Sequence, residues 1–464
     1  MAAFIKDEKN KKIIGLLNSN VGSLSNDSLV KIVRQLNFWL HEKQSLSESD
    51  KMEVTQKLID VAAWRNRDVK CPKVRFGKTE IQMPIITCGS MRFQHTWMPD
   101  FMPIIGPNKV KILQTPSQAN LTEIVRQCIK RGINHFETAR KYGTSEIQLS
   151  ESLQTLIREG EIKRSDFILQ TKLPVPTADT KGFKKYFDQS WKVFAPLAYI
   201  DLLSLWCVSK PDQADWVLSD EEDSYMSTAL RWKEEGKIKH IGFSTHGNAE
   251  IIMKLIESNK FEYVNLHYHF FGSYHAEGTS DGNGGHGNSA CVKRALELDM
   301  GVLNISPIDK GGQLYQPSAT VARLIGYKLS PIAFAALHSW ETANIHTISI
   351  GLARPEDLDE VLDAAMLFIN KKQMKPLLKA AEERLINHSK LTLGEEWHEK
   401  SLLNLPSCFE KESIKGISLG HMLWSYNMLQ AYGMYDTALA RYRRLEKSAK
   451  WNDKKSFDDN MKAM

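Results

Sequence analysis

The chain has 464 residues, of which 42% are hydrophobic and 25% are charged, and its formal net charge is +6. These values are typical of a globular protein with room for one large domain and additional segments. Because the net charge is small and no long block carries a single sign, the composition disfavours a nucleic-acid-binding protein, while acidic small molecules stay open as partners.

The cysteines and the first residues predict a cytoplasmic protein. The six cysteines are scattered and no two have C-x-x-C spacing, so we expect free thiols in a reducing compartment. Residues 1–20 mix charges with short apolar pieces and contain neither a signal-peptide core nor a membrane span. We therefore expect no membrane partner.

Residues 1–71 are predicted to form an N-terminal helical extension. Apolar residues recur there at spacings of three and four behind the cap candidates Asn26 and Asp27, as in an amphipathic helix. These apolar positions are Leu29, Ile32, Val33, Leu36 and Leu40. Such an extension either packs on the main domain or contacts another subunit or a partner.

Residues 72–370 alternate short apolar strands with helical stretches. Eight strand-then-helix units fit a closed parallel (β/α)8 TIM barrel better than an open doubly wound sheet. No G-x-G-x-x-G follows the first strand, which also argues against a Rossmann domain. The predicted strands are 84–89, 134–139, 166–172, 199–206, 239–245, 262–268, 301–307 and 346–351. Residues 371–464 are predicted as a C-terminal helical region.

Four side chains fall at the ends of neighbouring predicted strands, where barrel enzymes carry their catalytic groups. They are Glu137, Tyr142, Lys172 and Trp206. An ammonium beside a phenol favours the phenolate, so Lys172 is expected to make Tyr142 a better acid, with Glu137 keeping Lys172 charged and in place. Such a site could protonate the alkoxide formed when a cofactor adds hydride to a carbonyl. Alternatively, Tyr142 is a capping aromatic and Lys172 a solvated loop residue.

These residues lie in blocks that resemble the aldo-keto reductase superfamily. The blocks run in order through FGKTEIQMPIITCGSM, GINHFETARKYGTSEIQLSESL, FILQTKLP, YIDLLSLW, EEGKIKHIGFSTHG, FEYVNLHYHF, ISPIDKGG and SIGLARPEDLDEVL. The resemblance covers about residues 74–370, continues more weakly over 371–450, and is closest to the branch with a C-terminal iron–sulfur region. It implies an NADPH-dependent reductase of small carbonyl substrates that uses Asp, Tyr, Lys and His.

Two of the four catalytic positions depart from the family pattern. Tyr142 matches the family's acid and Lys172 its lysine, but Glu137 stands for the aspartate and Trp206 for the histidine. Glutamate retains the charge at a slightly different distance. Tryptophan leaves a single N–H donor on a bulkier ring, and losing one such donor costs on the order of 10²–10³ in rate.

The resemblance also implies a nucleotide site. The residues it places around the nicotinamide carboxamide are Ser244, Thr245 and Asn265, and those around the diphosphate and 2′-phosphate are Ser306, Lys310 and Arg354. Ile305 replaces the tyrosine that often stacks under the nicotinamide ring. Arginine suits a phosphate through bidentate hydrogen bonds, although Arg354 could also be a plain surface residue.

No metal site is predicted. His267 and His269 lie two residues apart on a predicted strand, before a glycine-rich loop, but this spacing matches no compact ligand set. An iron–sulfur cluster needs about four thiolates. Since 371–464 contains Cys408 alone, we expect a degenerate ferredoxin-like region without a cluster.

Two functions follow as hypotheses. The first is an NADP(H)-dependent carbonyl reductase with Tyr142 as general acid. The second, prompted by Glu137 and Trp206, is a pseudoenzyme that binds NADP(H) and acts as a sensor or scaffold. The sequence does not identify the substrate or the oligomeric state.

Overall fold

The structure is a computed structural model that describes residues 69–92, 116–272, 288–308, 317–326, 328–402 and 419–436, with the single residues 113 and 439. The helices predicted within residues 1–68 lie outside the described residues, as do Lys310 and Cys408.

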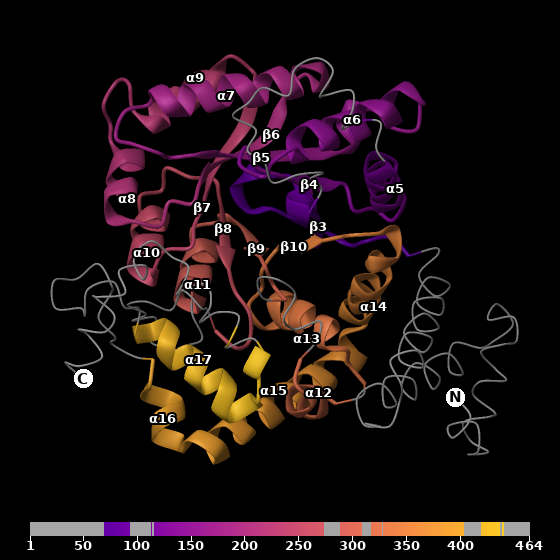
Figure 1. The fold of residues 1–464 in the computed structure, drawn as a ribbon, viewed down its shortest axis with the longest axis vertical. Coiled ribbons are helices and arrows are strands. Elements are labelled where there is room, and N and C mark those ends of the chain that lie inside the picture. The colour runs from indigo at the N-terminus through magenta and orange to yellow at the C-terminus, as the bar shows by residue number, and fades with distance from the viewer. Residues whose placement is uncertain are drawn as a thin grey trace, which may run out of the picture.

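Eight parallel strands form a closed barrel at the centre of the molecule (Figure 1). Each strand pairs with the next one along the chain, and the last, β10, pairs with the first, β3. The barrel strands are β3 (Ile86–Gly89), β4 (His135–Glu137), β5 (Ile168–Pro174), β6 (Ile200–Trp206), β7 (Ile238–Ser244), β8 (Tyr263–His267), β9 (Gly301–Ile305) and β10 (Thr347–Gly351). The predicted TIM barrel is confirmed, and each of the eight predicted strands overlaps an observed one.

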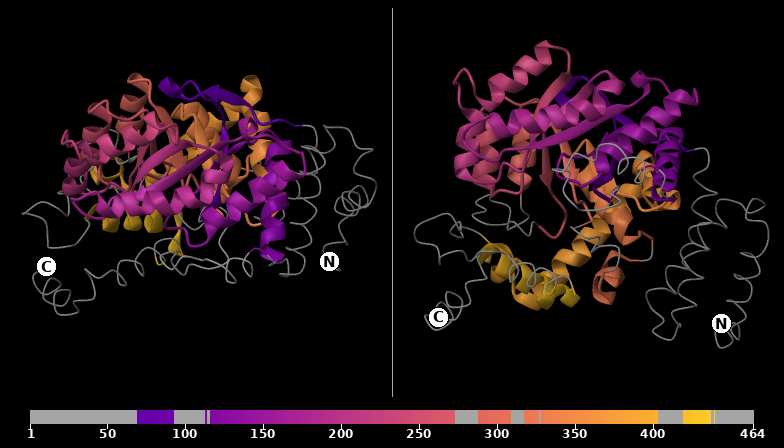
Figure 2. Two further views of the ribbon diagram at one scale, coloured as in Figure 1. Left: turned by 90° about the horizontal axis from the view of Figure 1, so that it is seen from above. Right: turned by 45° about the horizontal axis from the view of Figure 1, so that its top comes forward.

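Helices surround the barrel and cover the outer faces of its strands (Figures 1 and 2). The barrel helices are α5 (Pro116–Lys130), α6 (Ser145–Arg158), α7 (Lys181–Phe194), α8 (Pro211–Leu218), α9 (Tyr225–Glu234), α10 (Ala249–Glu257), α11 (Ser289–Glu297), α12 (Ala319–Ile325), α13 (Pro331–Leu337) and α14 (Leu358–Ile369). None of the helices in the described part of the chain has the length and apolarity that crossing a membrane requires.

The alternation of side chains along β5 explains why one layer of the barrel interior is polar. Because side chains alternate across a strand, Leu169, Thr171 and Leu173 face the helices while Gln170 and Lys172 face into the barrel. The register sets Lys172 opposite Ser204 of β6, and Glu137 of β4 opposite Gln170. Polar residues at inward positions of adjacent strands therefore meet inside the barrel.

An antiparallel hairpin, which the sequence analysis did not predict, closes the amino-terminal end of the barrel. It consists of β1 (Lys73–Arg75) and β2 (Gln82–Pro84). Its apolar residues Phe76 and Met83 pack on Ile168, Leu202, Tyr263 and Leu303 of the barrel. Gly301 allows this close approach, since a Cβ there would lie 2.6 Å from the ring of Phe76. The site must therefore open at the other end.

Three further helices lie together on one side of the barrel, next to α12 and α13 (Figure 1). They are α15 (Lys371–Leu393), α16 (Glu395–Lys400) and α17 (Leu419–Tyr432). Arg384 of α15 donates to the backbone oxygens of Leu324 and Ile325 at 2.6 and 2.8 Å. Trp424 of α17 donates through Nε1 to the backbone oxygen of Phe271 at 2.7 Å. These helices agree with the helical region predicted after residue 370, whose standing as a separate domain stays a prediction.

Candidate active site

Tyr142 lies in the short loop between β4 and α6. Turn hydrogen bonds from Tyr142 N to the oxygen of Ala139, and from Ser145 N to the oxygen of Tyr142, are each 3.0 Å long. Arg140 N donates to the backbone oxygen of Lys172 at 3.0 Å, which ties the loop to β5. The loop thus carries a half-buried phenol along the rim of the barrel to the strand that holds Lys172.

Glu137 and Lys172 form a buried ion pair, with side chains that are 4% and 1% exposed. Lys172 Nζ also donates to the backbone oxygen of Thr138 at 2.9 Å, and Ser349 Oγ donates to Glu137 Oε2 at 2.8 Å. Gly89 leaves space for the Ser349 hydroxyl that holds this carboxylate, since a Cβ there would lie 2.5 Å from Ser349 Oγ. The longer glutamate therefore reaches the lysine with one oxygen, while Ser349 holds the other.

The phenol and the ammonium meet at the carboxyl ends of the strands. Lys172 Nζ lies 5.0 Å from the centroid of the Tyr142 ring, and the Trp206 ring meets Tyr142 edge-on at a centroid distance of 6.1 Å. No hydrogen bond joins the Tyr142 hydroxyl to Lys172 Nζ in this arrangement. The four residues predicted from neighbouring strand ends are brought together, with the ammonium against the face of the phenol ring.

The pKa of Tyr142 is raised, whereas the sequence analysis expected Lys172 to lower it. Burial raises the pKa of the Tyr142 phenol well above its ordinary value of about 10, and nearby Cys207 adds to the rise. Burial likewise lowers the pKa of the Lys172 ammonium well below its ordinary value, while the contact with Glu137 works against this shift. The expectation of a lowered phenol pKa is therefore not met in the free protein, where burial of the phenol sets the direction of the shift.

Three of the residues predicted for the nicotinamide lie on β7 and β8 or directly after them. Ser244 Oγ accepts a hydrogen bond from Cys207 N at 3.1 Å, and Thr245 Oγ1 donates to the oxygen of Val208 at 2.7 Å. Asn265 Oδ1 accepts from Gln170 Nε2 at 3.2 Å. Asn265 Nδ2 is buried and has no hydrogen-bond partner within the described ranges. The hydroxyls of Ser244 and Thr245 therefore hold the loop after β6 against the end of β7. Among the described residues, the side-chain N–H group of Asn265 is left as an unused donor.

The residues predicted for the phosphates follow the last two barrel strands. Ser306, directly after β9, is half-buried and has a left-handed backbone with φ of 60°, which is uncommon outside glycine. Arg354, after β10, is 52% exposed in its side chain and pairs with Asp357 at 3.0 Å. Both lie at the carboxyl rim, where TIM barrels frequently bind phosphate through the loops after strands seven and eight.

The family of the chain follows from its sequence as a whole. The model of the Aldo/keto reductase family matches residues 86–381, which include every barrel strand. The chain belongs to this family.

Individual relatives are distant. Protein REDOX 2 of Catharanthus roseus is 27% identical over 167 residues, a match that spans 34% of this chain and only about half of that protein (51%). An aldo-keto reductase from Bacillus halodurans in its holo form shares 15% identity over 67% of this chain and 96% of its own, with a TM-score of 0.48. A Bombyx mori aldo-keto reductase in complex with NADP shares 18% over 67% and 93%, with a TM-score of 0.46. The iron–sulfur branch stays a prediction.

This aldo-keto reductase has a polar layer below its candidate catalytic residues that the sequence analysis did not single out. His135, one layer below Glu137, is fully buried, and its Nδ1 lies 2.8 Å from Thr87 Oγ1. Burial, helped by the charge of Lys172, lowers the pKa of His135 to about 3, so its ring is neutral. Gln170 Nε2 donates to Ser204 Oγ at 3.0 Å. The period-two pattern of β4 and β5 could have indicated this layer.

The described residues of this aldo-keto reductase hold no metal-binding cluster. Within them, no group of three or more His, Cys, Asp or Glu side chains is arranged to hold an ion. His267 and His269 are both buried, with rings in an edge contact at 4.9 Å. The five cysteines in the described ranges are free thiols.

Proposed function

We propose that this aldo-keto reductase is an NADP(H)-dependent oxidoreductase that reduces a small carbonyl substrate, with Tyr142 as the proton donor. The observation that carries the proposal is the ring of Tyr142 against the buried Glu137–Lys172 pair at the carboxyl rim. The nicotinamide supplies the hydride when bound, because no side chain can. The chain must then deliver a proton to the carbonyl oxygen.

Each residue of the cluster has a part in moving that proton. Because its pKa is raised, Tyr142 is protonated at neutral pH and holds the proton to be donated. The positive charge of Lys172 near the ring stabilises the phenolate that remains after donation. Glu137 keeps that charge in place, and is itself held by Ser349. Exclusion of water from the pair strengthens these electrostatic effects.

The residues present fit a nicotinamide nucleotide. Asn265 Nδ2, buried with no partner in the described parts of the chain, is a suitable donor for a carboxamide oxygen. Ser306 and Arg354 lie at the rim used for phosphates in this kind of barrel, and the guanidinium suits a 2′-phosphate. The NADP complex of the Bombyx mori relative supports this choice of cofactor. We include Lys310 and the backbone around Ser244 and Thr245 in the same proposed site.

Steady-state kinetics with NADPH and a panel of aldehydes and quinones tests the proposal. Wild-type protein is expected to oxidise NADPH with at least one substrate, and Tyr142→Phe to lower kcat by about 10²–10⁴, the range for loss of a general acid. Tyr199→Phe is the matched control. Its ring lies under Arg164 and Lys239 near the start of β6, far from the mouth, so kcat should not change.

Two outcomes would overturn the proposal. Turnover that survives in Tyr142→Phe would show that another group donates the proton. NADPH binding, followed by tryptophan fluorescence, without turnover on any substrate would favour the sensor or scaffold hypothesis instead.

A further inference from the structure

The loop that carries Tyr142 is held by a second buried ion pair. Arg140 Nη1 lies 2.5 Å from Glu146 Oε2, and the two side chains are 5% and 0% exposed. One partner precedes Tyr142 by two residues and the other follows it by four. The pair therefore spans the turn that presents the phenol, on the side away from Lys172 and Glu137.

Glu146 also fastens this turn to neighbouring elements. Thr171 Oγ1 of β5 donates to Glu146 Oε1 at 2.6 Å. Ser190 Oγ of α7 lies 2.9 and 3.0 Å from the two carboxylate oxygens. Thr171 directly precedes Lys172, and Arg140 N donates to the oxygen of Lys172. The turn with the phenol and the strand with the ammonium are thus joined through both side chain and backbone.

Holding a turn with a buried ion pair carries a large desolvation penalty. Removing two charges from water is unfavourable, and apolar residues of similar size are often as stabilising or more so. The buried pair at this place therefore indicates that the turn carrying Tyr142 must be held in one position. A misplacement of about 1 Å can cost about 10²-fold in rate.

We propose that Arg140 and Glu146 are positioning residues of the reaction: they fix the Tyr142 ring over Lys172 Nζ by locking the turn to β5 and α7. Neither residue touches the reacting atoms, and their effect passes through Tyr142. This inference rests on the proposed function, in which Tyr142 donates the proton.

The double variant Arg140→Met/Glu146→Gln tests the inference. A single substitution would leave one buried charge unpaired and could prevent folding, whereas the double variant removes both charges. Glutamine is isosteric with glutamate, and methionine replaces the apolar stem of arginine. Glutamine keeps an acceptor for Thr171 and Ser190, but Arg140 is no longer joined through it to β5 and α7, so the lock on the Tyr142 side of the turn is lost. We expect kcat to fall by about 10–100-fold with KM for NADPH unchanged, because the phenol moves while the nucleotide site does not.

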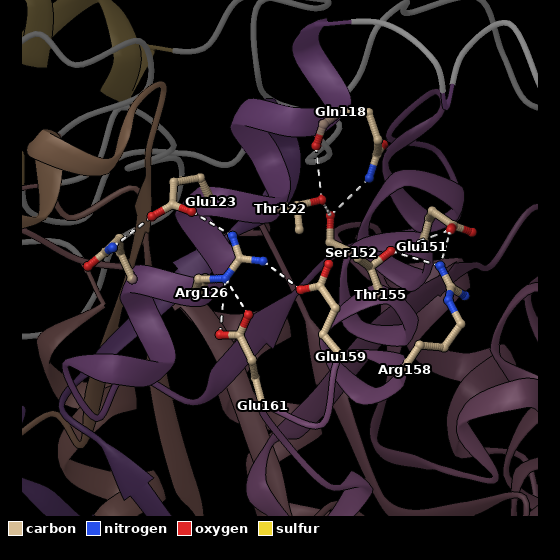
Figure 3. A network of polar contacts seen from close by, with 11 residues as sticks. Gln118, Thr122, Glu123, Arg126, Glu151, Ser152, Thr155, Arg158, Glu159 and Glu161 are labelled. Carbon is tan, nitrogen blue, oxygen red and sulfur yellow. Dashed lines mark hydrogen bonds and ion pairs between the residues drawn. The ribbon is translucent and has the colours of Figure 1, made fainter.

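A second ion-pair network provides the control. Figure 3 shows Arg126 of α5 between Glu123, Glu159 and Glu161. The ion-pair distances to these three carboxylates are 2.6, 2.7 and 2.8 Å. Two of these carboxylates follow the carboxyl end of α6, so the network lies toward the opposite rim of the barrel. Arg126→Met/Glu161→Gln makes the same chemical change there. It is expected to alter stability and to leave kcat unchanged.

A cycle with Tyr142→Phe separates positioning from general structural damage. If Arg140 and Glu146 act through the phenol, adding their double substitution to Tyr142→Phe should not lower the residual rate further. Equal losses in both backgrounds would overturn the inference and leave the proposed function standing. An unchanged rate in Tyr142→Phe alone would instead overturn the proposed function.

A crystal structure of the double variant gives a readout independent of turnover. The inference predicts that the Tyr142 ring leaves its place 5.0 Å from Lys172 Nζ while the Glu137–Lys172 pair remains. A ring found at the original distance would overturn the inference, whatever the activity.

Discussion

At the scale of single residues, Trp206 limits the hydrogen-bond donors that the proposed site has next to Tyr142. Its indole has one N–H donor that does not titrate, and its ring fills space beside Tyr142. A titratable ring at this position would give a carbonyl oxygen a charged donor at low pH. In the proposed mechanism the site relies instead on Tyr142 and on the buried charge beneath it.

Replacing Trp206 with histidine is therefore expected to raise the rate of carbonyl reduction. Trp206→His should increase kcat by about 10-fold or more, since a single donor to a developing oxyanion contributes 10²–10³. The gain should grow as pH falls through about 6.5, where the imidazole becomes charged. Measuring kcat from pH 5 to 9 checks this, with Trp191→His on the outer helix α7 as control. A rate at or below wild type with no new pH dependence would contradict the prediction.

At the scale of elements, α14 carries a buried carboxyl group, Glu360, whose charged form is disfavoured by its burial. Burial raises the pKa of Glu360 to about 7; a hydrogen bond with Ser330 works against the rise, and Asp363 and Asp357 add to it. A carboxyl whose pKa is higher in the folded than in the unfolded state stabilises the fold at low pH. That contribution is lost as pH rises from about 4.5, its ordinary pKa, to about 7.

Glu360→Gln is accordingly expected to stabilise the protein at alkaline pH. Glutamine remains neutral, so the variant should gain about 1–3 kcal/mol over wild type at pH 8.5 and almost nothing at pH 4.5. Denaturant midpoints at the two pH values measure the difference. Glu356→Gln, at an exposed residue in the turn just before α14, should change the stability by much less than Glu360→Gln at both pH values. An equal gain at both pH values would show that something other than ionisation is responsible.

At the scale of the whole molecule, the helices after residue 370 share the core of the barrel. One continuous cluster of buried apolar residues runs from the barrel strands to Trp424 and Met428 of α17. Trp424 is 1% exposed and donates to the loop after β8. We expect the described C-terminal helices and the barrel to unfold together.

Trp424→Ala tests this cooperativity. Truncating a buried tryptophan should destabilise the protein by about 3–5 kcal/mol, and the loss should appear as a shift of one common transition. Circular dichroism and tryptophan fluorescence during denaturation would then give coincident curves. Met422→Ala on the same helix, where the side chain is 40% exposed, should change little. An early separate transition with an unchanged barrel midpoint would contradict the expectation.

The sequence indicated the barrel and its rim because both depend on local pattern. Apolar runs of strand length followed by helical spacing predict β5 and β6, and the last residues of those runs are Lys172 and Trp206 whatever the packing around them. The hairpin at the amino-terminal end of the barrel was not predicted, because three-residue strands such as β1 and β2 are too short to show a recognisable periodicity.

What the sequence by itself determined was the order of the elements, the rim on which Glu137, Tyr142, Lys172 and Trp206 end, and the family blocks that contain them. Only the tertiary structure decided that burial dominates the phenol's ionisation, that Gly89 makes space for the Ser349 hydroxyl that holds Glu137, and that Glu146 joins the turn to β5 and α7. The reason is physical: periodicity is a property of neighbours along the chain, whereas desolvation and contact depend on residues from distant segments that meet when the barrel closes.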